Sequence, residues 1–139
     1  FAMETVFSDW RAQADGRIAS KIDLLREMQE AGYFVLLLFV GLASDQISIA
    51  RVSTRVAKGG HAVQESKLIS RFPRTQRAIA AALDVANAAI LVDNSREPKH
   101  AFTVCHVRLS DEIIYDRRRE RHHVPAEIQA WLAKIVPSP

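Results

Sequence analysis

The stretch Tyr33-Phe-Val-Leu-Leu-Leu-Phe-Val40 is an uninterrupted apolar run, and it decides which fold the sequence predicts. It lacks the alternation of polar and apolar side chains, which is typical of a strand that is covered on both faces. The residues that follow it, Gly41-Leu-Ala-Ser44, predict a tight turn in which Ser44 caps the start of a helix. A buried strand that leads directly into a helix is the unit from which parallel α/β sheets are built.

The segment before this run predicts a first strand and a first helix. Phe1–Thr5 is mostly apolar and ends in Glu4 and Thr5, so two polar side chains would lie at the carboxyl end of a strand. In open α/β sheets that edge is where ligands bind. Apolar residues then recur at helical spacing, which predicts an amphipathic helix over about residues 15–31. The apolar residues that define this helix are Ile18, Ile22, Leu25 and Met28.

The rest of the chain continues the alternation of helices and strands. We therefore expect an α/β fold, with a parallel sheet flanked by helices, in a single domain of 139 residues. The expected elements are helices over 64–71 and 75–88, a buried strand over 89–93, an edge hairpin of strands 101–109 and 112–115, and a last helix after Pro125 that buries Ile128, Trp131, Leu132 and Ile135.

Six of the seven Lys and Arg residues between positions 51 and 77 form two sets, which Gly59 and Gly60 divide. The first three are spaced i, i+4, i+7 and share one helix face, and the two glycines end that helix. Guanidinium groups match phosphate oxygens in pairs, so two such helices in a mobile region of about 51–78 predict a clamp for a phosphate-bearing molecule. The alternative is solvated charge on exposed helix faces. The first set is Arg51, Arg55 and Lys58, and the second is Arg71, Arg74 and Arg77.

Composition excludes several classes of function. A formal net charge of +3 is not the electrostatic signature of a nucleic-acid-binding protein. We interpret the charge run at 116–123 as a solvated link, with nucleic-acid binding by its basic part, 117–123, as the alternative. No apolar run is long enough to span a bilayer. The single cysteine, Cys105, excludes an intrachain disulfide and favours a reducing, cytoplasmic location. Cys105 and His106 are neighbours on one strand and point to opposite faces, so we expect no metal site there.

Several of these pieces together resemble the zeta-toxin-like P-loop kinases over about residues 1–95. They are Glu4-Thr5 after a strand, the amphipathic helix, the apolar strand, the pattern Arg-Val-x-x-Arg-Val-x-x-Gly-Gly-His-x-Val that starts at Arg51, and Asp93-Asn-Ser95 after a late strand.

The resemblance implies a doubly wound kinase that transfers the γ-phosphoryl group of ATP, with Mg²⁺, to a hydroxyl group of a small molecule, for which a UDP-N-acetyl sugar is a candidate. It also implies that Arg55 and Arg71 steady the triphosphate, and that a small helical antitoxin is a partner. The residues that would hold the substrate are Glu4, Thr5 and His61. For His61 the alternative is that it only caps the turn. The residues that would add phosphate contacts are Arg51, Lys58 and Arg74.

One part of the family pattern is missing from the sequence. The phosphate loop Gly-x-x-x-x-Gly-Lys-Ser/Thr does not occur in these 139 residues, and neither does the catalytic aspartate on the strand after it. We expect both to lie before Phe1, in an N-terminal part of the fold, so that this chain alone would be inactive as a kinase. The alternative is a non-catalytic remnant that binds a nucleotide or a protein through the same arginines.

Overall fold

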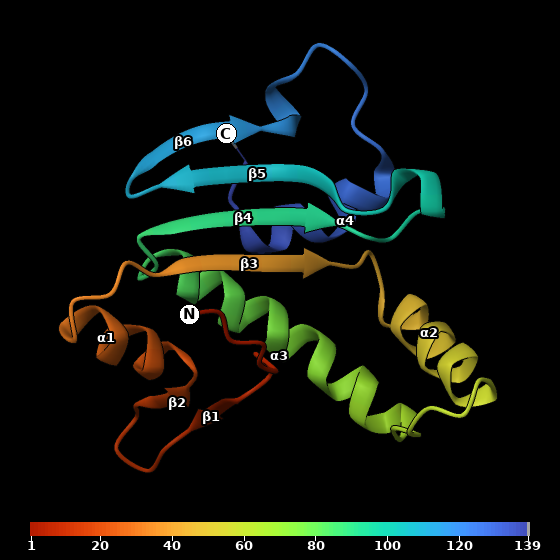
Figure 1. Ribbon diagram of the computed structural model, residues 1–139, viewed down its shortest axis with the longest axis horizontal. Coiled ribbons are helices and arrows are strands. Elements are labelled where there is room, and N and C mark those ends of the chain that lie inside the picture. The colour runs from red at the N-terminus through yellow and green to blue at the C-terminus, as the bar shows by residue number, and fades with distance from the viewer. Residues whose placement is uncertain (139) are drawn as a thin grey trace.

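The computed structural model describes residues 1–138 and shows a mixed α/β arrangement around a four-stranded sheet (Figure 1). The strand order is β3-β4-β5-β6, with β3 (Leu36–Gly41) and β4 (Ala88–Asp93) parallel. β5 (Thr103–Leu109) and β6 (Glu112–Asp116) extend it as an antiparallel hairpin, which confirms the predicted edge hairpin. The prediction of a parallel sheet holds only for β3 and β4.

Three helices pack against one face of this sheet. They are α1 (Ile22–Glu30), α3 (Glu65–Leu83) and α4 (Ala126–Ile135). Their apolar side chains and those of alternate strand residues form one buried cluster, whose removal from water is the main stabilising term of such a fold. The cluster confirms the predicted inward face of the last helix, and its central members are Leu37, Ile79, Leu91, Ile128, Trp131 and Leu132.

The opposite face of the sheet is not covered by a helix in the described residues. Leu36, Leu38 and Val40 alternate with buried neighbours along β3, and their side chains are 55%, 63% and 40% exposed. The prediction that this strand is covered on both faces is therefore wrong for the described part of the chain. Its continuous apolar sequence reflects one packed face and one face open to solvent.

The N-terminal segment differs from the sequence-based prediction. Phe1–Thr5 forms no strand and is exposed, so Glu4 and Thr5 do not lie at a sheet edge. A small hairpin of β1 (Trp10–Ala12) and β2 (Ile18–Ser20) comes next, and it takes up the first residues of the predicted helix. The reason is the turn between the two strands, where Gly16 adopts a φ of +82°, a conformation that interrupts any helix.

Helix α2 (Asp45–Ala57) forms as predicted, because the Ser44 hydroxyl accepts a hydrogen bond from the backbone N–H of Ile47. None of its residues is fully buried, so the helix lies at the periphery. α3 is one helix through Pro73, where two helices were expected. A proline lacks the N–H for one helical hydrogen bond, and the buried side chains beyond Pro73 hold the helix together across that gap. Those side chains are Gln76, Ala78, Ile79, Ala82 and Leu83.

The basic segment after β6 is a solvated link only in part, because residues 119–123 are exposed whereas Arg117 and Arg118 are partly buried. It contains a short 3-10 turn, Arg117–Arg119, and Arg118 is largely buried, with its guanidinium donating to both oxygens of Asp116 at 2.6 and 2.9 Å. The same guanidinium donates to the carbonyl oxygens of Val136 and Pro137, so it ties these residues to β6.

A second 3-10 turn, Pro98–His100, lies between β4 and β5. Among the described helices, none combines the length and the apolarity needed to cross a bilayer.

Acid is expected to destabilise this protein through His106 and Asp116. Burial lowers the pKa of His106 more than the neighbouring Asp116 carboxylate raises it, and hydrogen bonds from Arg118 lower the pKa of Asp116 although its burial opposes this. Both groups bind protons more readily in the unfolded chain, so stability is full above about pH 6.5 and falls as the pH drops through the folded pKa of each group. Urea unfolding between pH 7.5 and 4 measures this loss.

Two histidine variants test whether His106 causes the loss of stability between pH 7.5 and 5. His106→Gln is expected to flatten the pH dependence of unfolding between pH 7.5 and 5, because a neutral amide replaces the titrating imidazole. His61→Gln changes a histidine that is exposed, and it should leave the dependence as it is in the wild type. Equal pH profiles for the wild type and His106→Gln would contradict the assignment.

Candidate phosphate-binding cleft

The candidate site lies where the two parallel strands end. Gly41 and Asp93, the last residues of β3 and β4, are partners in the sheet, and the N–H of Asn94 donates to the carbonyl oxygen of Gly41 at 3.0 Å. α2 starts a few residues beyond β3, at this same edge (Figure 1). The carboxyl ends of parallel strands are the usual place for ligand sites in open sheets.

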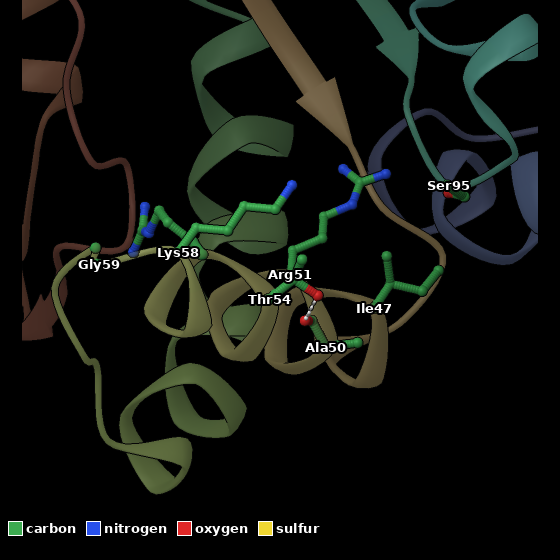
Figure 2. A pocket seen from close by; sticks show the side chains of 9 residues that line it. Ile47, Ala50, Arg51, Thr54, Lys58, Gly59 and Ser95 are labelled. Atoms are coloured by element: carbon green, nitrogen blue, oxygen red, sulfur yellow. Dashed lines mark hydrogen bonds between the residues drawn. The ribbon is translucent and has the colours of Figure 1, made fainter.

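An open cleft of about 720 Å³ runs along α2 and reaches the loop after β4. Figure 2 shows Arg51 and Lys58 extending from the same side of α2, toward the end of β3. Arg55, between them in the sequence, also lines the cleft, so the shared helix face predicted from the spacing is confirmed. The remaining lining residues are Ile47, Ala50, Thr54, Gly59, Gly60 and Ser95.

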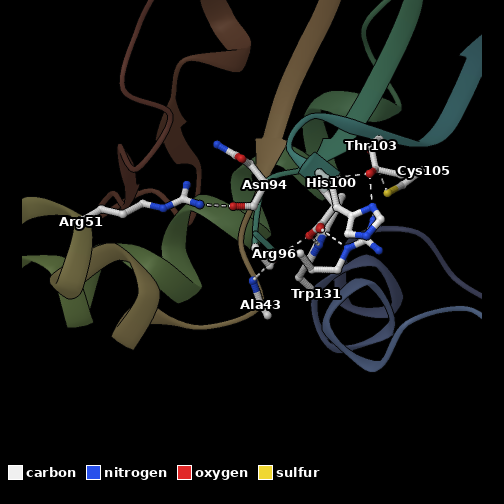
Figure 3. A network of polar contacts seen from close by, with 10 residues as sticks. Ala43, Arg51, Asn94, Arg96, His100, Thr103, Cys105 and Trp131 are labelled. Atoms are coloured by element: carbon white, nitrogen blue, oxygen red, sulfur yellow. Dashed lines mark hydrogen bonds and ion pairs between the residues drawn. The ribbon is translucent and has the colours of Figure 1, made fainter. Parts of the chain in front are cut away.

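Hydrogen bonds fix the end of β4 against the start of α2. The Arg51 guanidinium donates to the backbone carbonyl oxygen of Asn94 (Figure 3). The hydroxyl of Ser95 accepts from the N–H of Ala43 at 2.8 Å and donates to Asp93 at 2.6 Å. One cation of the cleft is thus held in place by the backbone, and the two loops that follow the parallel strands are joined.

Asp93 stabilises this edge from inside the core. Its side chain is fully buried, and one carboxylate oxygen accepts hydrogen bonds from the indole N–H of Trp131 at 2.9 Å and from Ser95. The other oxygen pairs with Arg96 at 3.4 Å, and Arg96 also donates to Thr103 (Figure 3). Asp93 therefore supports the loop structurally and does not line the cleft.

Cys105, at the edge of the same network, is not a nucleophile. Its side chain is fully buried, and burial, aided by the charge of Asp93, raises the pKa of its thiol to about 12. A thiol with this pKa is protonated at neutral pH, and only the thiolate is reactive. Cys105 therefore contributes to the packing of the core.

The two glycines after α2 act as predicted from the sequence. Gly59 has a φ of +89°, which is favourable only for glycine, and its N–H closes the last turn of the helix on Val56. A Cβ atom at Gly60 would lie 2.6 Å from Cγ of Arg55. The chain can therefore pass close beside Arg55 only because residue 60 has no side chain.

The other predicted site residues do not line this cleft. Arg71 lines a separate cavity, and Arg74 donates to the carbonyl oxygen of Ser70 on its own helix at 3.1 Å. The cleft therefore takes its cations from one helix, where the sequence suggested two. His61 is exposed just beyond the glycines, and Glu4 and Thr5 are exposed in the N-terminal coil.

Ser95 lines the cleft, although sequence reasoning assigned it no role. Its signal was present, since Asp93-Asn-Ser95 places three polar residues at the end of a buried strand. The sequence could not show that the Ser95 hydroxyl binds both Asp93 and the backbone of Ala43. Those contacts depend on the pairing of β3 with β4.

The lining of the cleft fits phosphate groups better than it fits a metal ion. Arg51, Arg55 and Lys58 are matched by no carboxylate among the described residues that line it, and guanidinium groups bind phosphate oxygens in pairs. Mg²⁺ prefers oxygen ligands such as carboxylates, and the described residues contain no group of three or more His, Cys, Asp or Glu side chains placed to hold a metal ion.

No protein-family model, curated protein or solved structure matches the chain. The resemblance to zeta-toxin-like kinases therefore rests on its residues alone.

Proposed function

We propose that the cleft along α2 binds the phosphate groups of a nucleotide, and that the protein is an ATP-dependent small-molecule kinase of the zeta-toxin type, which is active only together with the phosphate loop that these 139 residues lack. The observation that supports this most is the set of three cations on one helix face, at the carboxyl ends of two parallel strands, with no carboxylate in the described lining. The zeta-toxin-like pattern of the same residues gives the proposal its reaction class.

The arrangement suits phosphoryl transfer, in which the protein mainly positions groups and neutralises charge on phosphate oxygens. Arg51 is steadied by the Asn94 carbonyl oxygen, and its other N–H groups remain able to donate to a ligand. Arg55 and Lys58 stand one and two turns further along the helix and can neutralise successive phosphates. Bound ATP would supply the γ-phosphoryl group, with Mg²⁺ carried on its phosphates. The acceptor is a hydroxyl of a small molecule, with a UDP-N-acetyl sugar as the first candidate.

A second candidate function is nucleotide binding without transfer. It is favoured by the absence of any Asp, Glu or His among the described residues that line the cleft. Without such a group, the cleft itself provides no general base for a hydroxyl acceptor. This candidate keeps the phosphate contacts and omits the chemistry.

Arg55→Gln is expected to weaken binding of ATP and of inorganic tripolyphosphate about tenfold, because one charge-assisted contact is lost. Calorimetric titration at two salt concentrations measures this, with binding weaker at the higher salt. Arg121→Gln removes an exposed arginine far along the chain, and it should bind as the wild type does. Equal losses in the two variants would show that net charge, and not the cleft, attracts the ligand.

A transfer assay separates the two candidate functions. Because the 139 residues alone are expected to be inactive, the assay uses the product of the complete gene, including any residues encoded before Phe1. It is incubated with γ-labelled ATP, Mg²⁺ and UDP-N-acetylglucosamine, and labelled product is measured. Transfer that is lost in Arg55→Gln supports the kinase. Tight binding of ATP with no transfer to this sugar or to a panel of other hydroxyl compounds supports the binding function. Failure to bind either ATP or tripolyphosphate contradicts both.

A further inference from the structure

A second cavity lies beside α2 and separate from the cation cleft. It has a volume of about 250 Å³, and none of its lining residues lines the larger cleft. Four parts of the chain meet there: the N-terminal segment, the end of β3 and the turn after it, α2, and the middle of α3, with Trp131 of α4 at one side. Its lining residues are Val6, Ser8, Phe39, Val40, Leu42, Ser48, Leu68, Arg71, Phe72, Thr75, Gln76 and Trp131.

The walls of this cavity are mainly apolar and aromatic. Phe39 and Trp131 contact each other edge to face, with ring centroids 5.9 Å apart, and Phe72 and Leu68 of α3 also contribute to the lining. Concave sites with apolar walls and a few polar groups are typical of small-molecule binding. A volume of 250 Å³ is about eight times the share of one water in the liquid, which is room for one ring with small substituents.

Gln76 gives the cavity an unsatisfied polar group. Its residue is only 8% exposed, and its amide nitrogen has no hydrogen-bond partner in the described part of the chain. An unpaired buried amide costs free energy, which a ligand can recover by pairing with it. The terminal amide rotates freely enough about its last torsion to present either its N–H or its carbonyl oxygen to a ligand.

Arg71 gives the same cavity a positive charge. It is partly buried and has no ion-pair partner among residues 1–138, whereas Arg74, one turn further along α3, is bonded to its own helix. The hydroxyl groups of Ser8, Ser48 and Thr75 add further donors and acceptors to the lining. The cavity thus combines a ring-sized apolar space, one unpaired amide and one uncompensated cation.

We propose that this cavity binds a small aromatic carboxylate that also carries an amide or carbonyl group. The ring would lie beside Phe39 and Phe72, the amide would pair with Gln76, and the carboxylate would pair with Arg71. This site goes beyond the proposed function, because its binding requires neither ATP nor the cations of α2.

The test uses three probes that differ by one group each. 4-Acetamidobenzoate carries the ring, the amide and the carboxylate, whereas 4-isopropylbenzoate lacks the amide and acetanilide lacks the carboxylate. Binding to the full chain, without nucleotide, is followed by NMR titration. We expect 4-acetamidobenzoate to bind with a Kd on the order of 1 mM, as a ligand of this size allows, and each truncated probe to bind at least fivefold more weakly.

Two variants test whether Gln76 binds the amide of the probe and whether Arg71 binds its carboxylate. Gln76→Met has nearly the same volume and should weaken 4-acetamidobenzoate about fivefold while leaving 4-isopropylbenzoate unchanged. Arg71→Met should weaken both carboxylates and leave acetanilide unchanged. Arg77→Gln removes an exposed arginine of the same helix that does not line the cavity, and it should bind all three probes as the wild type does.

Either of two results overturns the proposal. One is the absence of binding by 4-acetamidobenzoate at 10 mM to the wild-type chain, a measurement that needs no variant to fold. The other is equal affinity of the wild type for all three probes, which would show nonspecific contact with the apolar surface. Because no nucleotide is present, neither result depends on whether the α2 cleft binds ATP.

Discussion

Trp131→Ala is expected to lower the free energy of unfolding by about 4 kcal/mol, the usual cost of removing a large aromatic side chain from a packed core. Trp131 is fully buried, it contacts Phe39, and its ring lies so close to Gly41 that a Cβ atom there would be 2.5 Å away. The substitution also removes the indole N–H that binds Asp93, and leaves that buried carboxylate with fewer donors. Urea unfolding monitored by circular dichroism measures the loss.

Two further substitutions separate the causes of this effect. Trp131→Phe keeps most of the side-chain volume and removes the hydrogen bond to Asp93. It is therefore expected to lower the free energy of unfolding by about half as much as Trp131→Ala does. Trp10→Ala removes the other tryptophan, which is only partly buried, and should cost clearly less. A loss for Trp131→Ala no greater than that for Trp10→Ala would contradict the central position of Trp131.

Arg118→Ala is expected to lower the free energy of unfolding by about 3 kcal/mol, because it leaves the Asp116 carboxylate buried without the arginine that pairs with it. The Asp116 side chain is inaccessible, and Arg118 donates to both its oxygens. The same guanidinium holds the carbonyl oxygens of Val136 and Pro137, so the last residues of the chain also lose their contact with β6. Chemical denaturation measures the loss in the free energy of unfolding. Hydrogen exchange at the amides of residues 135 and 136 measures how far this part of the chain is loosened locally.

The neighbouring arginine provides the control for this prediction. Arg119→Ala changes an exposed side chain one residue away, and it should alter stability by less than about 0.5 kcal/mol. Adding Asp116→Asn to Arg118→Ala removes the unpaired charge and is expected to restore part of the loss. If the double variant were less stable than Arg118→Ala, the buried charge could not be the cause.

Local sequence patterns predicted much of the helical structure. The helix at 45–57 begins at Ser44 because a serine hydroxyl can pair with the free N–H groups of the first turn, and it ends before Gly59 because glycine tolerates a positive φ. The cationic face of that helix follows from the i, i+4, i+7 spacing alone. The buried side of α4 and the strand β4 also follow from short-range periodicity.

Patterns that depend on partners distant in the sequence were predicted less well. Phe1–Thr5 is apolar enough for a strand, but in the described chain no strand pairs with it, and the nearby hairpin of β1 and β2 forms instead. A run of apolar residues also cannot show whether one or both faces of a strand are covered, because that depends on where the helices pack. The open face of β3 is the result.

The sequence by itself determined which residues carry charge, where α2 starts and stops, and that Arg51, Arg55 and Lys58 share one face, because each of these depends on neighbours within a few residues. Only the tertiary structure decided that Ser95 joins these cations, and that Arg71 lies in another cavity beside Gln76. The reason is that strand pairing and helix packing bring together residues 40 or more positions apart, as in the bond between Arg51 and Asn94. No local pattern encodes those distances.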